Sequence, residues 1–319
     1  MIDINVNKCL FCIVAKENRI MESRLFLTVF LFVVALLPFP VHGSWLPFSL
    51  ENGHIIIEVK IGDQEAKAIL DSGAMSNLIS KSFVRKHGQN FTTSGKSVSQ
   101  GVNSTQKLQL YSNIPISLYG TDLVLDKVAA IWLSGADIIL GSGFFRSGIL
   151  QIDYPNSRLR FLHKKSVNLK KQANISMKPA SDSPLPAIEV LLKGKKAWLL
   201  FDTGSNGGLA LKRSFALDRG LIGEDTNSDQ IIVKGINNIG SYEKFKLDSV
   251  KIGPYELENV STSVPSEGQA SNLGSGFNTR SGTRLQRGVK TSGLLGYDVL
   301  KHFLITVDYE KYQMHIYAE

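Results

Sequence analysis

The chain has 319 residues, of which 43% are hydrophobic and 20% are charged, and its formal net charge is +8. This composition is that of a globular protein and excludes an intrinsically disordered one. The Lys and Arg residues are spread along the sequence without a dense basic block. We therefore expect a solvated basic surface and no nucleic-acid partner.

Residues 1–43 have the layout of an N-terminal extension followed by a secretory signal peptide. Arg24 precedes thirteen uncharged residues, 25–37, and Pro38 ends this run. A membrane span needs roughly 20 apolar residues, so the run favours a cleaved signal over an anchor. We expect a periplasmic or secreted protein, attached to a membrane only if the signal stays uncleaved.

Both cysteines, Cys9 and Cys12, lie within that N-terminal segment. Their C-x-x-C spacing is weak evidence for metal or redox chemistry, because no second pair and no histidine cluster follows. We predict no metal site and no cofactor.

The rest of the chain repeats a set of four markers in one order. They are an Asp between an apolar run and a Gly, a Gly-x-Asn turn, a Leu-Gly pair, and an Asp-Tyr pair twelve residues beyond that Gly. In the first half the markers are Asp71, Gly101 with Asn103, Leu140 with Gly141, and Asp153 with Tyr154. In the second half they are Asp202, Gly235 with Asn237, Leu295 with Gly296, and Asp308 with Tyr309. Such self-similarity predicts two structurally related domains.

Each half is expected to be mainly β. Apolar and polar residues alternate over 54–61 and 188–192, the period-two pattern of a half-buried strand. Short helices are expected at 78–87, 209–218, 144–146 and 299–303. We place the domains at 44–163 and 184–319, with a basic, polar linker at 164–183.

A carboxylate that follows three apolar residues and precedes a Gly is a costly choice for a purely structural residue. Burying it unpaired costs several kcal/mol or forces its pKa upward. The cost falls if Asp71 and Asp202 face each other and share one proton, because like charges about 3 Å apart cannot both ionise. One carboxylate would then act as a base on water while the other, protonated, polarises a carbonyl, which suits peptide hydrolysis.

The residues around each Asp fit that interpretation. The hydroxyls of Ser72 and Thr203 are placed to hydrogen-bond across to the backbone of the partner loop. Gly73 and Gly204 allow a tight turn in which no Cβ blocks the approach of backbone amides to the carboxylates.

These motifs resemble the aspartic peptidase superfamily, and residues 138–162 and 293–317 resemble the tandem form of bacterial retropepsin-like aspartyl proteases in particular. The resemblance implies two acid-protease β-barrels with pseudo-twofold symmetry, a central cleft and a peptide or protein substrate. It implies that Asp71 and Asp202 are the catalytic pair. The implied active-site loops contain Ser72, Gly73, Ala74, Thr203, Gly204 and Ser205. The implied ψ-shaped elements beneath them contain Leu140, Gly141, Leu295 and Gly296, and the implied flap tips contain Gly101, Asn103, Gly235 and Asn237.

The sequence departs from both familiar arrangements of this superfamily. Retroviral enzymes carry one motif and dimerise, whereas pepsin-like enzymes have larger, cysteine-bearing lobes. Ala74 in the first loop stands opposite Ser205 in the second. If Ser205 donates a hydrogen bond to Asp202, it would favour the charged form there and leave Asp71 holding the proton.

Three readings of function stay open at this point. The favoured one is an active peptidase whose two repeats form a pseudo-dimer within a monomer. The alternatives are a protease active only as a dimer of chains, and a non-catalytic protein that binds a peptide or an envelope ligand on the same fold. Residues 266–293 are either a surface loop or a lid, and the scattered histidines, among them His54, are expected to be surface or strand residues.

Overall fold

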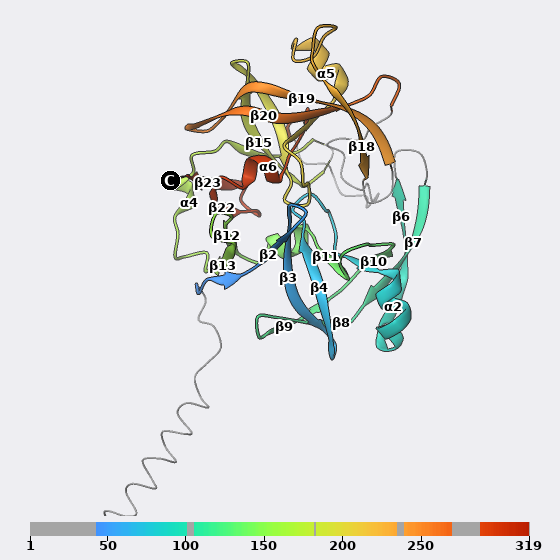
Figure 1. Cartoon of the computed structure of the whole chain (residues 1–319). Coiled ribbons are helices and arrows are strands. Elements are labelled where there is room, and N and C mark those ends of the chain that lie inside the picture. The colour runs from blue at the N-terminus through green and yellow to red at the C-terminus, as the bar shows by residue number, and fades with distance from the viewer. Residues whose placement is uncertain (1–42, 101–104, 182, 235–238, 270–287, 319) are drawn as a thin grey trace, which may run out of the picture. The chain divides into compact units, whose positions relative to one another are not determined.

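The computed structural model describes residues 43–100, 105–181, 183–234, 239–269 and 288–318 (Figure 1). They belong to one compact unit that runs from His42 to Glu319. About half of the chain is strand (53%) and 12% is helix, so the expectation of a mainly β protein is confirmed.

The first repeat forms a ten-stranded sheet in the order β6-β7-β10-β5-β11-β4-β3-β8-β9, with β2 paired to β3. Its strands are β2 (Ser49–Glu51), β3 (His54–Ile61), β4 (Gln64–Leu70), β5 (Leu78–Ser80), β6 (Thr92–Gln100), β7 (Thr105–Ser112), β8 (Ile114–Leu118), β9 (Thr121–Leu125), β10 (Val128–Ile131) and β11 (Ile138–Leu140). The predicted alternation in β3 is present, because Ile55, Ile57, Val59 and Ile61 are buried while Glu58 and Lys60 are exposed.

The second repeat forms an eight-stranded sheet that closes on itself. Its strands are β14 (Met177–Pro179), β15 (Pro186–Leu192), β16 (Lys195–Phe201), β17 (Leu209–Leu211), β18 (Asp229–Lys234), β19 (Ile239–Ile252), β20 (Tyr255–Pro265) and β21 (Gly293–Leu295). The path β15-β16-β21-β17-β20-β19 returns to its start because β19 also pairs with β15, which makes a six-stranded barrel.

The first repeat lacks the two long strands of that barrel. The second repeat has the long strands β19 and β20, which lie side by side in Figure 1. In the first repeat, two shorter strands, β7 and β8, take the place of β19, and two others, β9 and β10, take the place of β20. The interruptions fall at Asn113 and Lys127, whose φ angles of 57° and 55° are left-handed. The side chains of Asp126 and Ser112 accept hydrogen bonds from their backbone N–H groups, which stabilises the two breaks.

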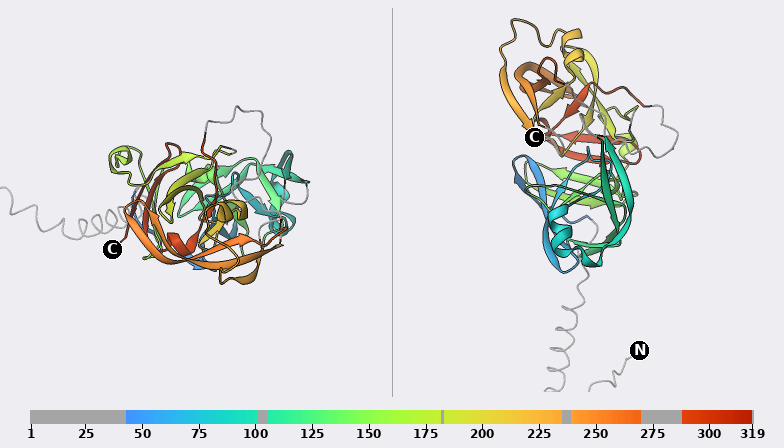
Figure 2. Two further views of the ribbon diagram at one scale, coloured as in Figure 1. Left: turned by 90° about the horizontal axis from the view of Figure 1, so that it is seen from above. Right: turned by 90° about the vertical axis from the view of Figure 1, so that its right-hand side faces the viewer.

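A five-stranded sheet joins the two repeats. It contains β1 (Leu46–Pro47), β13 (Arg158–Leu162), β12 (Ile149–Asp153), β22 (Leu304–Asp308) and β23 (Gln313–Tyr317), in that order. The antiparallel pairing of β12 with β22 makes the junction, and the right-hand view of Figure 2 shows these red and green strands next to each other. The proposed domain limits stay predictions, although the segment 164–183 contains α4 (Leu169–Gln172) and β14.

The remaining helices are short: α2 (Lys81–His87), the 3₁₀ turn η1 (Gly88–Asn90), α3 (Ser142–Phe145), α5 (Arg213–Asp218) and α6 (Tyr297–Leu300). The predicted helices 78–87 and 209–218 were too long, because their first residues form the buried strands β5 and β17. In α2, the Ser80 hydroxyl accepts from the N–H groups of Ser82 and Phe83 and caps the helix, which therefore starts at Lys81. The helices predicted at 144–146 and 299–303 begin two residues earlier than predicted, directly after Gly141 and Gly296. They end at 145 and 300.

Within the ranges that the structure describes, no helix combines the length and the apolar character needed to cross a membrane. The predicted extension and signal segment, residues 1–43, lies outside those ranges except for Gly43.

Candidate active site

Parallel strand pairing fixes where the Asp of each repeat lies. Asp71 follows β4 and Asp202 follows β16, and these strands pair in parallel with β11 and β21. The Asp71 N–H donates to the carbonyl of Leu140 at 3.0 Å, and the Asp202 N–H donates to that of Leu295 at 3.1 Å. The two Leu-Gly pairs therefore hold equivalent positions beside the two Asp loops.

The chain beyond each Leu-Gly pair passes against the adjacent Asp loop. In the first repeat the Gly141 N–H donates to Asn77 Oδ1 (2.9 Å), and the Ser142 N–H donates to the Ala74 carbonyl (2.7 Å). In the second repeat the Tyr297 N–H donates to the Ser205 carbonyl at 2.8 Å. The two segments that contain the residues predicted for the ψ-shaped elements therefore lie against the two Asp loops.

Only glycine fits at this crossing, which leads to a stability prediction. A Cβ on Gly141 would lie 2.5 Å from the Ser76 carbonyl oxygen and 2.7 Å from that of Ala74, both of them backbone atoms. Gly141→Ala is therefore expected to lower the free energy of unfolding by about 3 kcal/mol, the scale of overpacking in a rigid core. Gly143→Ala is the matched control, since a Cβ there meets nothing within 4 Å.

Urea unfolding of the two variants against the parent chain measures this difference. An equal effect of Gly141→Ala and Gly143→Ala would show that the crossing has room to relax.

Two buried hydroxyls tie the Asp loops to each other. The Ser72 hydroxyl donates to the Phe201 carbonyl (2.8 Å) and accepts from the Thr203 N–H (2.9 Å). The Thr203 hydroxyl donates to the Leu70 carbonyl (2.8 Å) and accepts from the Ser72 N–H (3.0 Å). Both side chains are fully buried. These four bonds are the cross-loop hydrogen bonds expected from the sequence, and they fix the spacing of the two loops.

Each loop glycine lies directly against the carboxyl group of the opposite loop. A Cβ on Gly73 would come within 2.6 Å of Asp202 Cγ, and one on Gly204 within 2.2 Å of Asp71 Cγ. No side chain can occupy either position without displacing a carboxyl group. The two Asp side chains consequently face each other, close enough for each carboxyl group to affect the pKa of the other.

Backbone amides stabilise the charged form of both carboxyl groups. Asp71 Oδ1 accepts from the N–H groups of Gly73 (2.9 Å) and Ala74 (3.0 Å). Asp202 Oδ1 accepts from the N–H of Gly204 at 2.9 Å, and the Ser205 backbone also acts to lower the pKa of Asp202.

Burial raises the pKa of both carboxyl groups, and the neighbouring charge of Asp71 raises that of Asp202 further, well above its ordinary value. The stronger rise at Asp202 favours Asp202 as the proton holder, which is the opposite of what the Ser205 argument predicts. Which of the two carboxyl groups holds the shared proton stays a prediction.

His54, expected to be a surface or strand residue, lies beside the Asp pair. It begins β3 after a tight turn in which Asn52 and Gly53 have positive φ angles of 51° and 81°. Desolvation lowers the pKa of His54, opposed by the charge of Asp71 and by the Gly204 backbone. Its Nδ1 is buried without a hydrogen-bond partner in the described part of the chain. The Asn-Gly turn was the one signal that could have placed a hairpin here.

The predicted flap tips, Gly101 with Asn103 and Gly235 with Asn237, lie outside the described residues. The strands on either side of them pair antiparallel, β6 with β7 and β18 with β19.

A comparison with protein families agrees with this geometry. Residues 57–144 and 188–299 each match the model of a family described as aspartyl protease, and together they make up more than half of the chain. The chain belongs to the aspartyl protease family. The two matches show that this aspartyl protease carries the family's domain twice, in tandem, as the repeated markers predicted. No curated protein matches the sequence.

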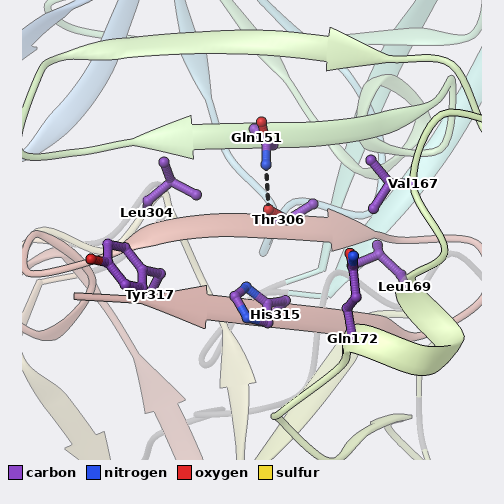
Figure 3. A pocket seen from close by; sticks show the side chains of 8 residues that line it. All are labelled: Gln151, Val167, Leu169, Gln172, Leu304, Thr306, His315 and Tyr317. Atoms are coloured by element: carbon purple, nitrogen blue, oxygen red, sulfur yellow. Dashed lines mark hydrogen bonds between the residues drawn. The ribbon is translucent and has the colours of Figure 1, made fainter. Parts of the chain in front are cut away.

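The chain also has a cavity of about 400 Å³ on the five-stranded sheet (Figure 3). Its walls are polar and apolar side chains from β12, β22, β23 and the α4 region: Gln151, Val167, Leu169, Gln172, Leu304, Thr306, His315 and Tyr317. Gln151 Nε2 donates to Thr306 Oγ1 at 2.7 Å across two strands (Figure 3). None of these residues belongs to an Asp loop.

Among the described residues, no three or more His, Cys, Asp or Glu side chains gather as a metal site.

Proposed function

We propose that this chain is an aspartic endopeptidase in which Asp71 and Asp202 of one chain activate water for peptide hydrolysis. The observation that carries the proposal is the direct apposition of the two carboxyl groups, each against the glycine of the opposite loop. A pair of buried carboxyls that shares one proton is chemically suited to act as base and acid in the same reaction.

The proposed reaction assigns a separate role to each carboxyl group. Asp71 removes a proton from a water molecule, and the resulting hydroxide adds to the carbonyl carbon of the scissile bond. Asp202 gives its proton to the carbonyl oxygen, so a neutral tetrahedral diol forms. Asp71 then passes its proton to the leaving nitrogen as the carbon–nitrogen bond breaks, and a diol proton returns to Asp202.

The surroundings of the two carboxyl groups support this division of roles. The charge of Asp71 raises the pKa of Asp202 well above its ordinary value, which suits an acid, and two N–H donors stabilise a charged Asp71, which suits a base. The cross-loop bonds of Ser72 and Thr203 hold both groups before substrate arrives, which lowers the reorganisation needed in the reaction.

The test is hydrolysis of a diverse peptide library by the full-length chain between about pH 3.5 and 7.5, with and without pepstatin. Activity is expected to be bell-shaped in pH. It falls on the acid side when Asp71 takes up a second proton, and on the alkaline side when the shared proton leaves Asp202. Because both pKa values are raised, the maximum is expected above the ordinary Asp pKa of about 4.

Peptide cleavage that pepstatin inhibits supports the proposal. A folded protein that cleaves nothing at any pH but binds peptides would instead identify a non-catalytic binding protein on this fold.

Export remains part of the proposal and is supported by the uncharged run at 25–37. Mass spectrometry of the N-terminus after expression in a secreting host tests it. A protein retained whole in the cytosol would contradict it.

A further inference from the structure

Tyr309, directly after β22, reaches from the second repeat into the Asp loop of the first. Its side chain is fully buried and packs against the ring of Phe145, with 5.6 Å between the ring centroids. The Arg146 guanidinium lies 5.8 Å from the Tyr309 ring centroid. The Tyr309 hydroxyl donates a hydrogen bond of 2.5 Å to the carbonyl oxygen of Ser72. A residue 237 positions further along the chain thus binds the residue next to Asp71.

This bond ends on the peptide group that supports Asp71. The carbonyl of Ser72 and the N–H of Gly73 belong to one peptide unit, and that N–H donates to Asp71 Oδ1 at 2.9 Å. A donor at the oxygen of a peptide group polarises it and strengthens its N–H as a donor. A continuous path therefore runs from the Tyr309 hydroxyl through the 72–73 peptide to the carboxylate of Asp71.

The Ser72 residue is held by the second repeat at every polar atom. Its N–H donates to Thr203 Oγ1, its hydroxyl donates to the Phe201 carbonyl, and its own carbonyl accepts from Tyr309.

Burial raises the pKa of Tyr309 well above its ordinary value, so the phenol keeps its proton and remains a donor at every pH of interest.

The matching tyrosine of the first repeat has no such bond. Tyr154 follows Asp153 as Tyr309 follows Asp308, and it is also buried, with 3% of its surface exposed. Its hydroxyl has no hydrogen-bond partner among the described residues. The two Asp loops are therefore supported unequally, and the additional hydrogen bond lies on the side of Asp71.

We infer that Tyr309 is a positioning residue whose hydroxyl fixes and polarises the 72–73 peptide, and thereby makes Asp71 the charged member of the pair. The inference deepens the proposed function, because it concerns which carboxyl group serves as the base. It does not depend on the substrate that the enzyme cleaves.

Removal of the Tyr309 hydroxyl leaves the other ionisable groups near Asp71 and Tyr309 in the chain. Asp71 is faced by Asp202 and His54, and Tyr309 is faced by Arg146, Tyr312 and the two carboxyls. Tyr154 adds to the surroundings of Asp202, and Tyr297 to those of Tyr154. A titration change in a Tyr309 variant therefore reports on the hydroxyl and its hydrogen bond.

The test compares Tyr309→Phe with Tyr154→Phe, a matched pair that removes one buried hydroxyl from each repeat. Carbon-13 NMR of the full chain, labelled at its aspartate carboxyl groups, gives the two macroscopic pKa values of the pair, with Asp71→Asn and Asp202→Asn to assign the signals. Tyr309→Phe is expected to raise the lower pKa by about 0.5, because a weaker Gly73 donor stabilises the charged carboxylate less. Tyr154→Phe is expected to leave it unchanged.

Kinetics provide the second readout on the same proteins. We expect Tyr309→Phe to lower kcat about tenfold with KM nearly unchanged, and to move the acid limb of the pH profile upward by the same shift. An unaltered lower pKa in Tyr309→Phe, or an equal rise in Tyr154→Phe, would overturn the inference. The NMR result stands even if the wild type cleaves no peptide, so the inference and the proposed function fail separately.

If Tyr309→Phe does not fold, 3-fluorotyrosine at position 309 replaces it in the experiment. Fluorine makes the phenol a stronger donor, so the lower pKa is then expected to fall. A value equal to that of the unsubstituted chain would again overturn the inference.

Discussion

Replacing either Asp71 or Asp202 with Asn is expected to lower kcat for peptide hydrolysis by about 10³- to 10⁴-fold. Asn at position 71 cannot take a proton from water, and Asn at position 202 cannot protonate the carbonyl oxygen. Both amides still fit the space, since each carboxyl group already lies against a glycine of the opposite loop. Steady-state rates on the best peptide of the library measure the loss.

These variants are not expected to lose activity by unfolding. The folded pKa of Asp202 is raised above its unfolded value, so the folded state binds the proton more tightly, and stability falls as pH rises above about 4. Asp202→Asn removes this penalty and should be at least as stable as the parent at pH 7. Asp63→Asn, in the exposed turn between β3 and β4, is the control and should retain full activity. Substantial activity in either Asp71→Asn or Asp202→Asn would mean that the pair does not act as one unit.

Gly204→Ala is expected to lower kcat by about 10²-fold or more, although it leaves both catalytic side chains in place. The new Cβ would fall 2.2 Å from Asp71 Cγ and 2.4 and 2.5 Å from its two oxygens. The carboxyl group of Asp71 must therefore move, and displacement of a catalytic group by about 1 Å costs that much in rate.

Gly207→Ala is the matched control for this substitution. It lies three residues further along the same loop, and a Cβ there meets nothing within 4 Å. The pH profile of Gly204→Ala should also change, because the carboxyl groups no longer face each other at the same separation. A kcat within about twofold of the parent would show that catalysis does not require the close approach of the two loops.

The local chemistry of the Asp loops was predictable from the sequence, because few structural roles suit an Asp between an apolar run and a Gly. The repeat of Asp71 at Asp202 added that two such loops exist, and the hydroxyls of Ser72 and Thr203 were assigned their cross-loop bonds correctly. These bonds join residues 129 and 133 positions apart, and they were predictable because the repeated motif indicates that two equivalent loops meet.

The groups that the sequence did not reveal act across long chain separations. His54 reaches the pair through a hairpin, and Tyr309 reaches Ser72 from the far end of the chain. The Asp-Tyr pairs were recognised as markers of the repeat, yet periodicity carries no information on what a buried hydroxyl contacts. Long-range contacts also explain why two helices were predicted too long. Residues 78–80 and 209–211 form strands because they pair with strands that are distant in the sequence.

The sequence repeat also did not indicate that two long strands of the second barrel are interrupted in the first repeat. Asn113 and Lys127 break two long strands in the first repeat, and each break depends on a side chain of the opposing segment, Asp126 or Ser112. Their spacing in the sequence is that of ordinary turn residues.

The central claim is that one chain contains a complete catalytic pair. The most direct test is the specific activity of the full-length chain over a wide range of concentration, with its mass followed by light scattering. We predict a constant activity per chain and a monomer at every concentration, because Asp71 and Asp202 already face each other within one chain. Activity that falls on dilution as a dimer dissociates would contradict the account and assign the site to two chains.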